Sequence, residues 1–187
     1  MIQEEIIRSP IGREQLVALA REAKIESDIT QDLVKNLFDY QNGVLVWKIK
    51  LNKRISINSI AGSKDGNGYV QVMINGKRYK AHRLIFKMFN GEVPEIIDHI
   101  NGVRDDNRIE NLRPASLSGN AQNSKKPQRN TSGFKNVYWH KAFGLWQVAI
   151  TAKNKMLHIG YYKDIHAANI AAISARKQHH GEFANHG

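Results

Sequence analysis

The chain opens with two helical patterns of hydrophobic positions. The first, SPIGREQLVALAREAK, offers Ser9 as N-cap and Pro10 at the first helical position. Its apolar positions recur at the spacing of one helical face: Leu16, Leu19, Ala20 and Ala23. A second, shorter helix is predicted after Asp28 or Thr30 as cap. Its buried side would hold Leu33, Val34, Leu37 and Phe38.

From residue 42 the hydrophobic period changes to two, which predicts strands. GVLVWKI and GYVQVMINGKRYKAHRL alternate, and Asn75-Gly76 marks a tight hairpin turn. The glycines of AGSKDGNGY predict turns rather than a phosphate cradle, because no helical pattern follows them. A helix is predicted in HRLIFKMFNGEVP, ending at Asn90-Gly91. Its apolar positions are Leu84, Ile85, Met88 and Phe89.

The next stretch, EIIDHINGVRDDNRIENL, sets polar side chains behind an apolar run. The isoleucines predict a short strand ending at Asp98 and His99, and a polar loop leads to a second strand at NLRPA. Ser116 or Ser118 would then cap a helix in LSGNAQNSKK. The predicted unit is therefore strand, loop, strand and helix, with polar groups converging from all of them.

The last third of the chain predicts a small sheet with one helix. GFKNVYWH, LWQVAITAK and KMLHIGYY indicate three short strands, and DIHAANIAAISARKQHHGEF indicates a helix with Asp164 as cap. Its small-residue face would hold Ala168, Ile170, Ala171, Ala172 and Ala175. The polar, basic stretch SKKPQRNTSG, residues 124–133, is the predicted linker before this sheet.

The amino-acid composition favours nucleic acid as a partner and limits the kinds of metal site that the chain can form. The 187 residues carry a net charge of +11, and residues 121–187 hold 10 Lys and Arg against 2 Asp and Glu. Such a basic surface attracts nucleic acid through counterion release. The chain has no cysteine, so any metal must be held by oxygen or imidazole. No signal peptide or membrane span is visible, so we expect a cytoplasmic protein with no membrane partner.

The segment HRLIFKMFNGEVPEIIDHINGVRDDNRIENLRPASLSGNAQN resembles an HNH homing-type endonuclease, a ββα-metal nuclease of the kind carried by bacteriophages and mobile elements. The resemblance covers about residues 36–123. It implies that His99 is the general base and Asn111 the middle residue of the motif, with Asn120 at the third position. It also implies that Asp98 and Asn120 hold the metal.

Elementary chemistry supports those roles. A neutral imidazole can take a proton from water at physiological pH, provided that the ring is held, and the amide oxygen of Asn111 would hold it. One carboxylate and one amide make an open site that suits Mg²⁺, with Mn²⁺ as a substitute. Asn123 is an alternative to Asn120 as ligand. No small-molecule cofactor is expected. Three arginines flank the site and are candidates to clamp phosphate: Arg83, Arg104 and Arg113.

Residues 131–187 resemble an AP2/ERF-like DNA-binding domain, in which the bare face of a three-stranded sheet enters the major groove. Alternation assigns the positions that face the helix: Trp146, Val148, Ile150, Leu157 and Ile159. Those that face outward are Lys135, Tyr138, His140, Gln147, Ala149, Thr151 and His158. The predicted DNA contacts are the polar members of that outward set, together with Lys125, Lys126 and Arg129 of the linker.

The sequence thus predicts an α+β protein with four parts. These are an N-terminal helical extension (1–30), a nuclease module with preceding β-hairpins (31–123), a basic linker (124–133) and the sheet with its helix (134–187). The predicted function is metal-dependent cleavage or nicking of double-stranded DNA at a site chosen by the last module. The alternatives are a non-catalytic DNA-binding regulator and, less favoured, an RNA substrate. The sequence leaves open whether the protein is a monomer or a homodimer.

Overall fold

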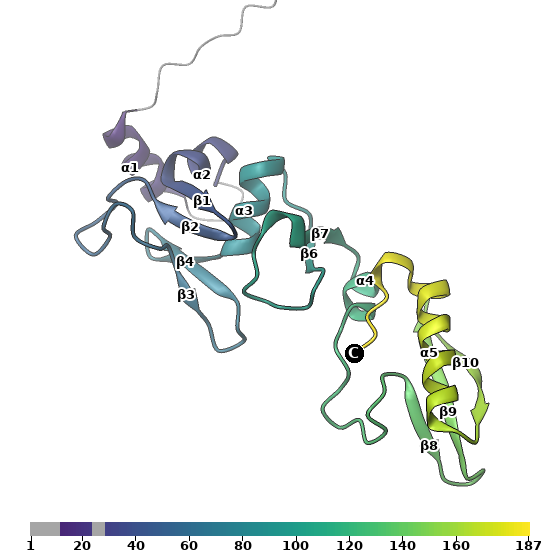
Figure 1. Ribbon diagram of the computed structural model, residues 1–187. Helices are drawn as coiled ribbons and strands as arrows, with labels where there is room; N and C mark the ends of the chain where they lie inside the picture. The colour runs from purple at the N-terminus through teal and green to yellow at the C-terminus, as the bar shows by residue number, and fades with distance from the viewer. Residues whose placement is uncertain (1–11, 24–28) are drawn as a thin grey trace, which may run out of the picture. The chain divides into compact units, whose positions relative to one another are not determined.

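The computed structural model describes residues 12–23 and 29–187, which form two compact units (Figure 1). One unit contains the described residues up to Val93 together with Arg104–Leu112. The other contains Pro94–Val103 and Arg113–Gly187. Mixed helices and small antiparallel sheets confirm the α+β class. The units do not follow the predicted module boundary at residue 123.

The first unit begins with two helices. α1 spans Arg13–Glu22, and α2 spans Gln31–Leu37 with Thr30 accepting a hydrogen bond from the Leu33 amide at 3.1 Å. The predicted caps Ser9, Pro10 and Asp28 lie outside the described residues. The side chains that α1 and α2 bury are Leu16, Ala20, Leu33, Val34 and Leu37. Leu19, predicted on the buried stripe of α1, is 40% exposed, and Phe38 opens a strand instead of closing α2.

Two small antiparallel sheets follow. β1 (Phe38–Gln41) pairs with β2 (Val44–Trp47), and β3 (Ser63–Lys64), β4 (Val70–Ile74) and β5 (Lys77–Lys80) form a meander. The predicted Asn75-Gly76 turn joins β4 to β5 and has positive φ at both residues, 47° and 78°, as a tight hairpin requires. α3 (Ala81–Asn90) then packs Leu84, Ile85 and Met88 into the core, while Phe89 is half-exposed.

The polar strand-loop-strand-helix segment is divided between the two units, with Arg104–Leu112 in the first unit and the rest in the second. β6 (Ile96–His99) and β7 (Leu112–Ala115) form a two-stranded sheet. Between them, η2 (Ile109–Asn111) is a short 3-10 turn that belongs to the first unit. α4 spans Leu117–Gln122, shorter than predicted, and Ser116 caps it by accepting from the Gly119 amide at 3.0 Å.

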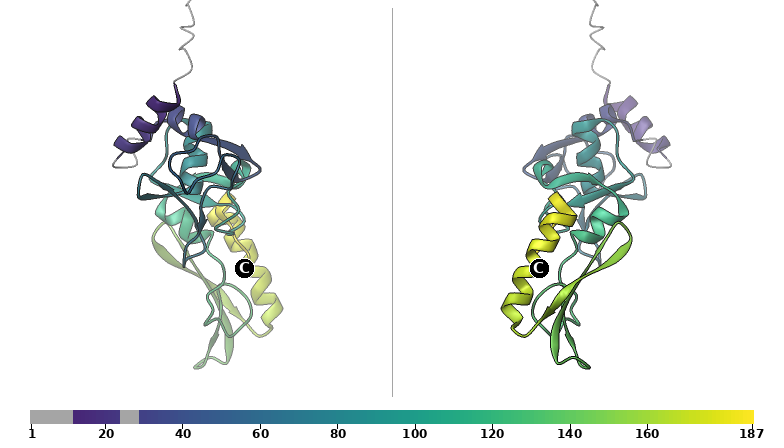
Figure 2. Two further views of the ribbon diagram at one scale, coloured as in Figure 1. Left: turned by 90° about the vertical axis from the view of Figure 1, so that its left-hand side faces the viewer. Right: turned by 90° about the vertical axis from the view of Figure 1, so that its right-hand side faces the viewer.

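The rest of the second unit is a sheet with one helix on it. β8 (Val137–His140), β9 (Leu145–Ala152) and β10 (Lys155–Tyr162) form an antiparallel sheet in the order β10-β9-β8. α5 (Ile165–His180) lies along one face, as Figures 1 and 2 show, and Asp164 caps it as predicted. The core between helix and sheet contains Val137, Val148, Ala168 and Ala172. Ile170, predicted on the buried face of α5, is 69% exposed.

A short turn, η3 (Gly181–Phe183), follows α5 and leads to the last residues of the second unit. No helix in the described part of the chain is long and apolar enough to cross a membrane.

Candidate active site

The Asp-His pair lies at the end of β6, and both side chains are buried. Asp98 is 4% exposed and His99 is 6% exposed. Because a buried carboxylate is costly unless it is paired, the partners of Asp98 determine what this end of the strand can do.

Arg113 on β7 is the charged partner of Asp98. Its Nε and Nη2 atoms both donate to Asp98 Oδ2, at 2.9 and 2.7 Å. The same guanidinium donates from Nη1 to the Glu182 carbonyl at 2.8 Å and lies 3.8 Å from the centre of the Phe183 ring. Arg113, predicted to clamp phosphate, therefore serves as an internal counter-ion in this structure.

Asn123 is the second partner of Asp98. Its Nδ2 atom donates to both carboxylate oxygens, at 2.9 and 3.0 Å, and to the His99 carbonyl at 2.8 Å. Asn185 in turn donates to the Asn123 carbonyl at 2.8 Å. Asn123 is thus fixed from both sides, and it joins the end of β6 to the end of α4.

Asn120 lies three residues earlier and is exposed. Its side chain makes no hydrogen bond to any described residue of the protein. The structure therefore brings Asn123, rather than Asn120, onto the carboxylate of Asp98. The exposed amide of Asn120 keeps its oxygen available for an external ligand.

The capacity of Asp98 for a metal depends on its remaining lone pairs. Oδ2 accepts from Arg113 and Asn123, whereas Oδ1 accepts only from Asn123. An ionised carboxylate offers about four acceptor positions in total, so Oδ1 can still bind a cation. Within the residues that the structure describes, no group of three or more His, Cys, Asp or Glu could hold a metal. The donor set fits a hard divalent cation that takes most of its ligands from water and phosphate.

Asn111 lies in the first unit, in the 3-10 turn η2. It is 6% exposed, and its amide donates to the Asp106 carbonyl at 2.7 Å. Asp106 itself accepts from Arg108 Nε and Nη2, both at 2.8 Å, as expected of a residue that shapes the loop. The side chain of Asn111 is therefore held by its own loop.

The other two flanking arginines also belong to the first unit. Arg104 donates to the Asn67 carbonyl at 2.9 Å and lies over the ring of Tyr69. Arg83 lies on α3 and is partly exposed.

The outward residues of the last sheet lie largely where alternation placed them. Tyr138 pairs with Gln147, and Gln147 pairs with Tyr161 on the other side, so these three share the face away from α5. Thr151 and His158 are exposed, His140 is half-buried with its ring stacked on Phe143, and Ala149 is 8% exposed. The linker residues Lys125, Lys126 and Arg129 are exposed.

The prediction that Lys135 faces outward is wrong. Lys135 is 7% exposed, and its ammonium donates to the carbonyls of Gln122, at 2.9 Å, and of Ser124. Burial, together with the nearby Arg176, lowers the pKa of Lys135 to about 8. The alternation of the strand does not reach Lys135, because β8 begins at Val137 and Asn136 has a positive φ of 67°. Lys135 therefore does not lie outward.

Sequence reasoning missed the C-terminal residues that support Asp98. Phe183 lies under Arg113 and also against α4, where a Cβ at Gly119 would come within 3.1 Å of the Phe183 ring. Asn185 holds Asn123. No local pattern links these positions to residues more than sixty places earlier in the chain.

Comparison with known proteins finds a nuclease family in the segment that contains Asp98 and His99. Residues 79–122 match a family described as HNH endonuclease. Protein 3.8 of Escherichia phage T7 is 34% identical over 111 residues, which cover 57% of this chain and 91% of that protein. No solved structure matches the chain significantly. The chain therefore belongs to the same family as Protein 3.8, and its residues 79–122 contain an HNH endonuclease domain.

Proposed function

We propose that the protein is a metal-dependent DNA endonuclease that nicks or cleaves double-stranded DNA at a site selected by its C-terminal sheet. The observation that carries this proposal is the Asp98-His99 pair at the end of β6, beside the amides of α4, within the segment that matches HNH endonucleases. A nuclease needs a base and a charge-stabilising group next to each other, and this strand end offers both.

His99 is the general base in this proposal. A neutral imidazole accepts a proton from water, and the water then attacks the phosphodiester. Asn111 keeps, in this proposal, the middle position of the HNH pattern. Asn111 suits a fixed role, since its own amide donates to the Asp106 carbonyl.

Asp98 and Asn120 would hold the divalent cation, Mg²⁺ or Mn²⁺. Oδ1 of Asp98 and the exposed amide of Asn120 are the groups with acceptor capacity left. Bound there, the cation would stabilise the charge that develops on the leaving oxygen. Arg113 and Asn123 hold the carboxylate in a fixed orientation through their hydrogen bonds.

The C-terminal sheet is proposed to select the DNA site in the manner of an AP2/ERF-like domain. Its support is the antiparallel sheet with α5 on one face only, which leaves the other face available for a major groove. The proposed contacts on that face are Tyr138, His140, Gln147, Thr151 and His158. The exposed linker residues Lys125, Lys126 and Arg129 would contact phosphate.

The two asparagines of α4 are expected to respond differently to alanine. Asn123→Ala removes a buried donor from Asp98 and from the His99 carbonyl, so the protein should lose about 1–3 kcal/mol of stability. Asn120→Ala removes only an exposed side chain, so the thermal midpoint should stay unchanged while the nicking rate falls. Thermal unfolding and plasmid nicking of both variants check this. A normal nicking rate for Asn120→Ala would exclude Asn120 as a ligand.

The experiment that tests the proposed function is incubation of supercoiled plasmid with the purified protein and Mg²⁺. With one site per chain, nicked circles should accumulate before linear product, and a chelator should stop the reaction. A second function has one observation in its favour, because Arg113 and Asn123 already donate hydrogen bonds to the Asp98 carboxylate, as in a purely structural ion pair. A non-catalytic DNA-binding regulator would shift the plasmid on a gel and leave it supercoiled.

A further inference from the structure

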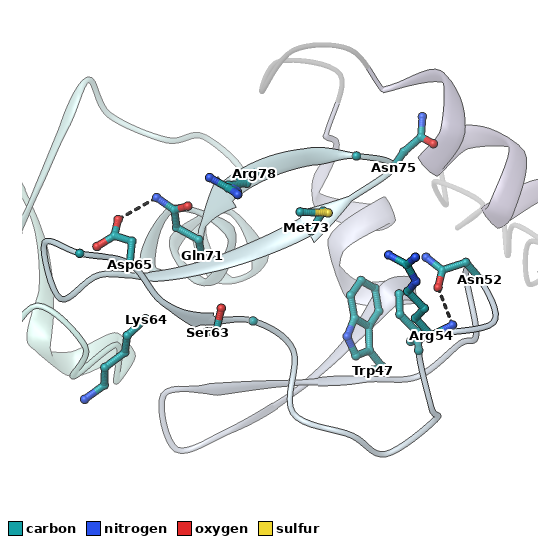
Figure 3. Close-up of a pocket in the computed structure, with 14 residues that line it drawn as sticks. Trp47, Asn52, Arg54, Ser63, Lys64, Asp65, Gln71, Met73, Asn75 and Arg78 are labelled. Atoms are coloured by element: carbon teal, nitrogen blue, oxygen red, sulfur yellow. Dashed lines mark hydrogen bonds between the residues drawn. The ribbon is translucent and has the colours of Figure 1, made fainter.

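The first unit contains a cavity to which neither the family nor the proposed reaction gives a role. It measures about 550 Å³ and lies between the β3–β5 sheet and the loop that precedes it. This volume is within the range of small-ligand sites, roughly 300–1,000 Å³. Figure 3 shows Met73 and Arg78 on the two paired strands, and Trp47 and Arg54 on the part of the chain that precedes them.

One end of this cavity is neutral. Asp65 accepts hydrogen bonds from Gln71, at 2.7 Å, and from the Lys80 ammonium. The hydrogen bond from Lys80 is the main cause that lowers the pKa of Asp65 to about 2. Lys64 is likewise paired, with Asp105. The cations at this end therefore already have acidic partners.

Two other cations that line the cavity, Arg54 and Arg78, have no acidic partner among the described residues. The guanidinium groups of Arg54 and Arg78 form no hydrogen bond or ion pair with any residue in the described ranges, 12–23 and 29–187. Arg78 faces Met73 across β4 and β5, and Met73 is 52% exposed. The cavity thus combines two free planar donors with an exposed apolar side chain.

These features define the ligand chemistry. Guanidinium forks match the oxygens of a phosphate group, and an apolar wall suits a sugar or a base edge. Arg54, Met73 and Arg78 are all exposed, so the cavity is open along one side. A site for a free small molecule encloses most of its ligand, whereas a site for one unit of a polymer must let the strand continue.

We propose that this cavity binds one nucleotide unit of a DNA strand, with its phosphodiester on Arg54 and Arg78 and its sugar or base against Met73. This inference rests on the proposed function, and it adds a DNA contact in the first unit, separate from the C-terminal sheet. The contact gives the β3–β5 sheet a part in holding the substrate.

The test is a salt titration of duplex binding by the full-length chain. His99→Ala serves as the background, so that the DNA stays intact, and fluorescence anisotropy reports the affinity. Adding Arg54→Gln and Arg78→Gln should weaken binding and reduce the slope of log affinity against log salt by about 0.9, the value for the loss of one phosphate contact. The matched control is Lys35→Gln with Lys87→Gln, two cations of the same unit that do not line the cavity. Its slope should change clearly less.

A second pair of variants tests the apolar wall. Met73→Glu places a negative charge in the cavity and should weaken duplex binding, whereas Met73→Leu should not. Met73 is 52% exposed, so neither substitution should prevent folding.

Three outcomes would overturn the inference. An unchanged salt slope in the arginine variant, or an equal change in the lysine control, would remove the cavity as a DNA contact while leaving the proposed function intact. If thymidine monophosphate binds the background variant but not the arginine variant, and the salt slope for DNA is the same in both, the ligand is a free nucleotide. If the background variant binds no duplex at all, the proposed function and this inference both fail.

Discussion

Replacing His99 with alanine is expected to reduce Mg²⁺-dependent nicking by about 10²–10⁴-fold, because the attacking water loses its base. Rates from supercoiled plasmid on agarose gels measure this directly. Duplex binding by gel shift should remain, because the proposed DNA contacts on the C-terminal sheet are not altered.

His166→Ala is the matched control for His99→Ala. His166 is an exposed histidine on α5, it has no assigned role, and its removal should leave nicking unchanged. Full nicking activity in His99→Ala would remove the hydrolytic mechanism, whatever the control shows.

Replacing Asp98 with alanine is expected to have two effects at once. Nicking should be lost, because the proposed metal loses its only carboxylate ligand. The protein should also become less stable by about 3–5 kcal/mol, the usual cost of leaving one member of a buried ion pair unpaired. The side chain of Arg113 is only 12% exposed, so little water can compensate for its lost partner. Denaturant unfolding and plasmid nicking give the two quantities.

The double variant Asp98→Ala with Arg113→Met separates the two effects. Removing the unpaired charge should restore much of the lost stability, since an apolar side chain can replace a buried ion pair at little cost. Nicking should stay absent. If the stable double variant nicks plasmid at the normal rate, Asp98 has a structural role only.

Locally encoded features of the fold were predictable from the sequence. The Asn75-Gly76 turn, the Ser116 and Asp164 caps and the three strands of the last sheet all depend on residues within a few positions of one another. Turns and caps of this kind depend on neighbouring residues and not on tertiary packing, so they can be predicted from one sequence.

The arrangement around Asp98 was not predictable in the same way. Asn120 and Asn123 lie on or next to one short helix, and which of them meets Asp98 depends on how that helix docks. The docking involves Phe183 and Asn185, far along the chain. Lys135 shows the other limit, because it precedes β8 and does not share the period of two that places Tyr138 and His140 outward.

The most direct test of the account measures binding and cleavage together on one supercoiled plasmid, with no metal and then with Mg²⁺, Mn²⁺ or Ca²⁺. We expect a gel shift under every condition and nicked circles with Mg²⁺ and Mn²⁺, which disappear in the Asp98→Ala variant. A plasmid that stays supercoiled with every metal, while the gel shift persists, would contradict the account and identify the protein as a DNA-binding regulator.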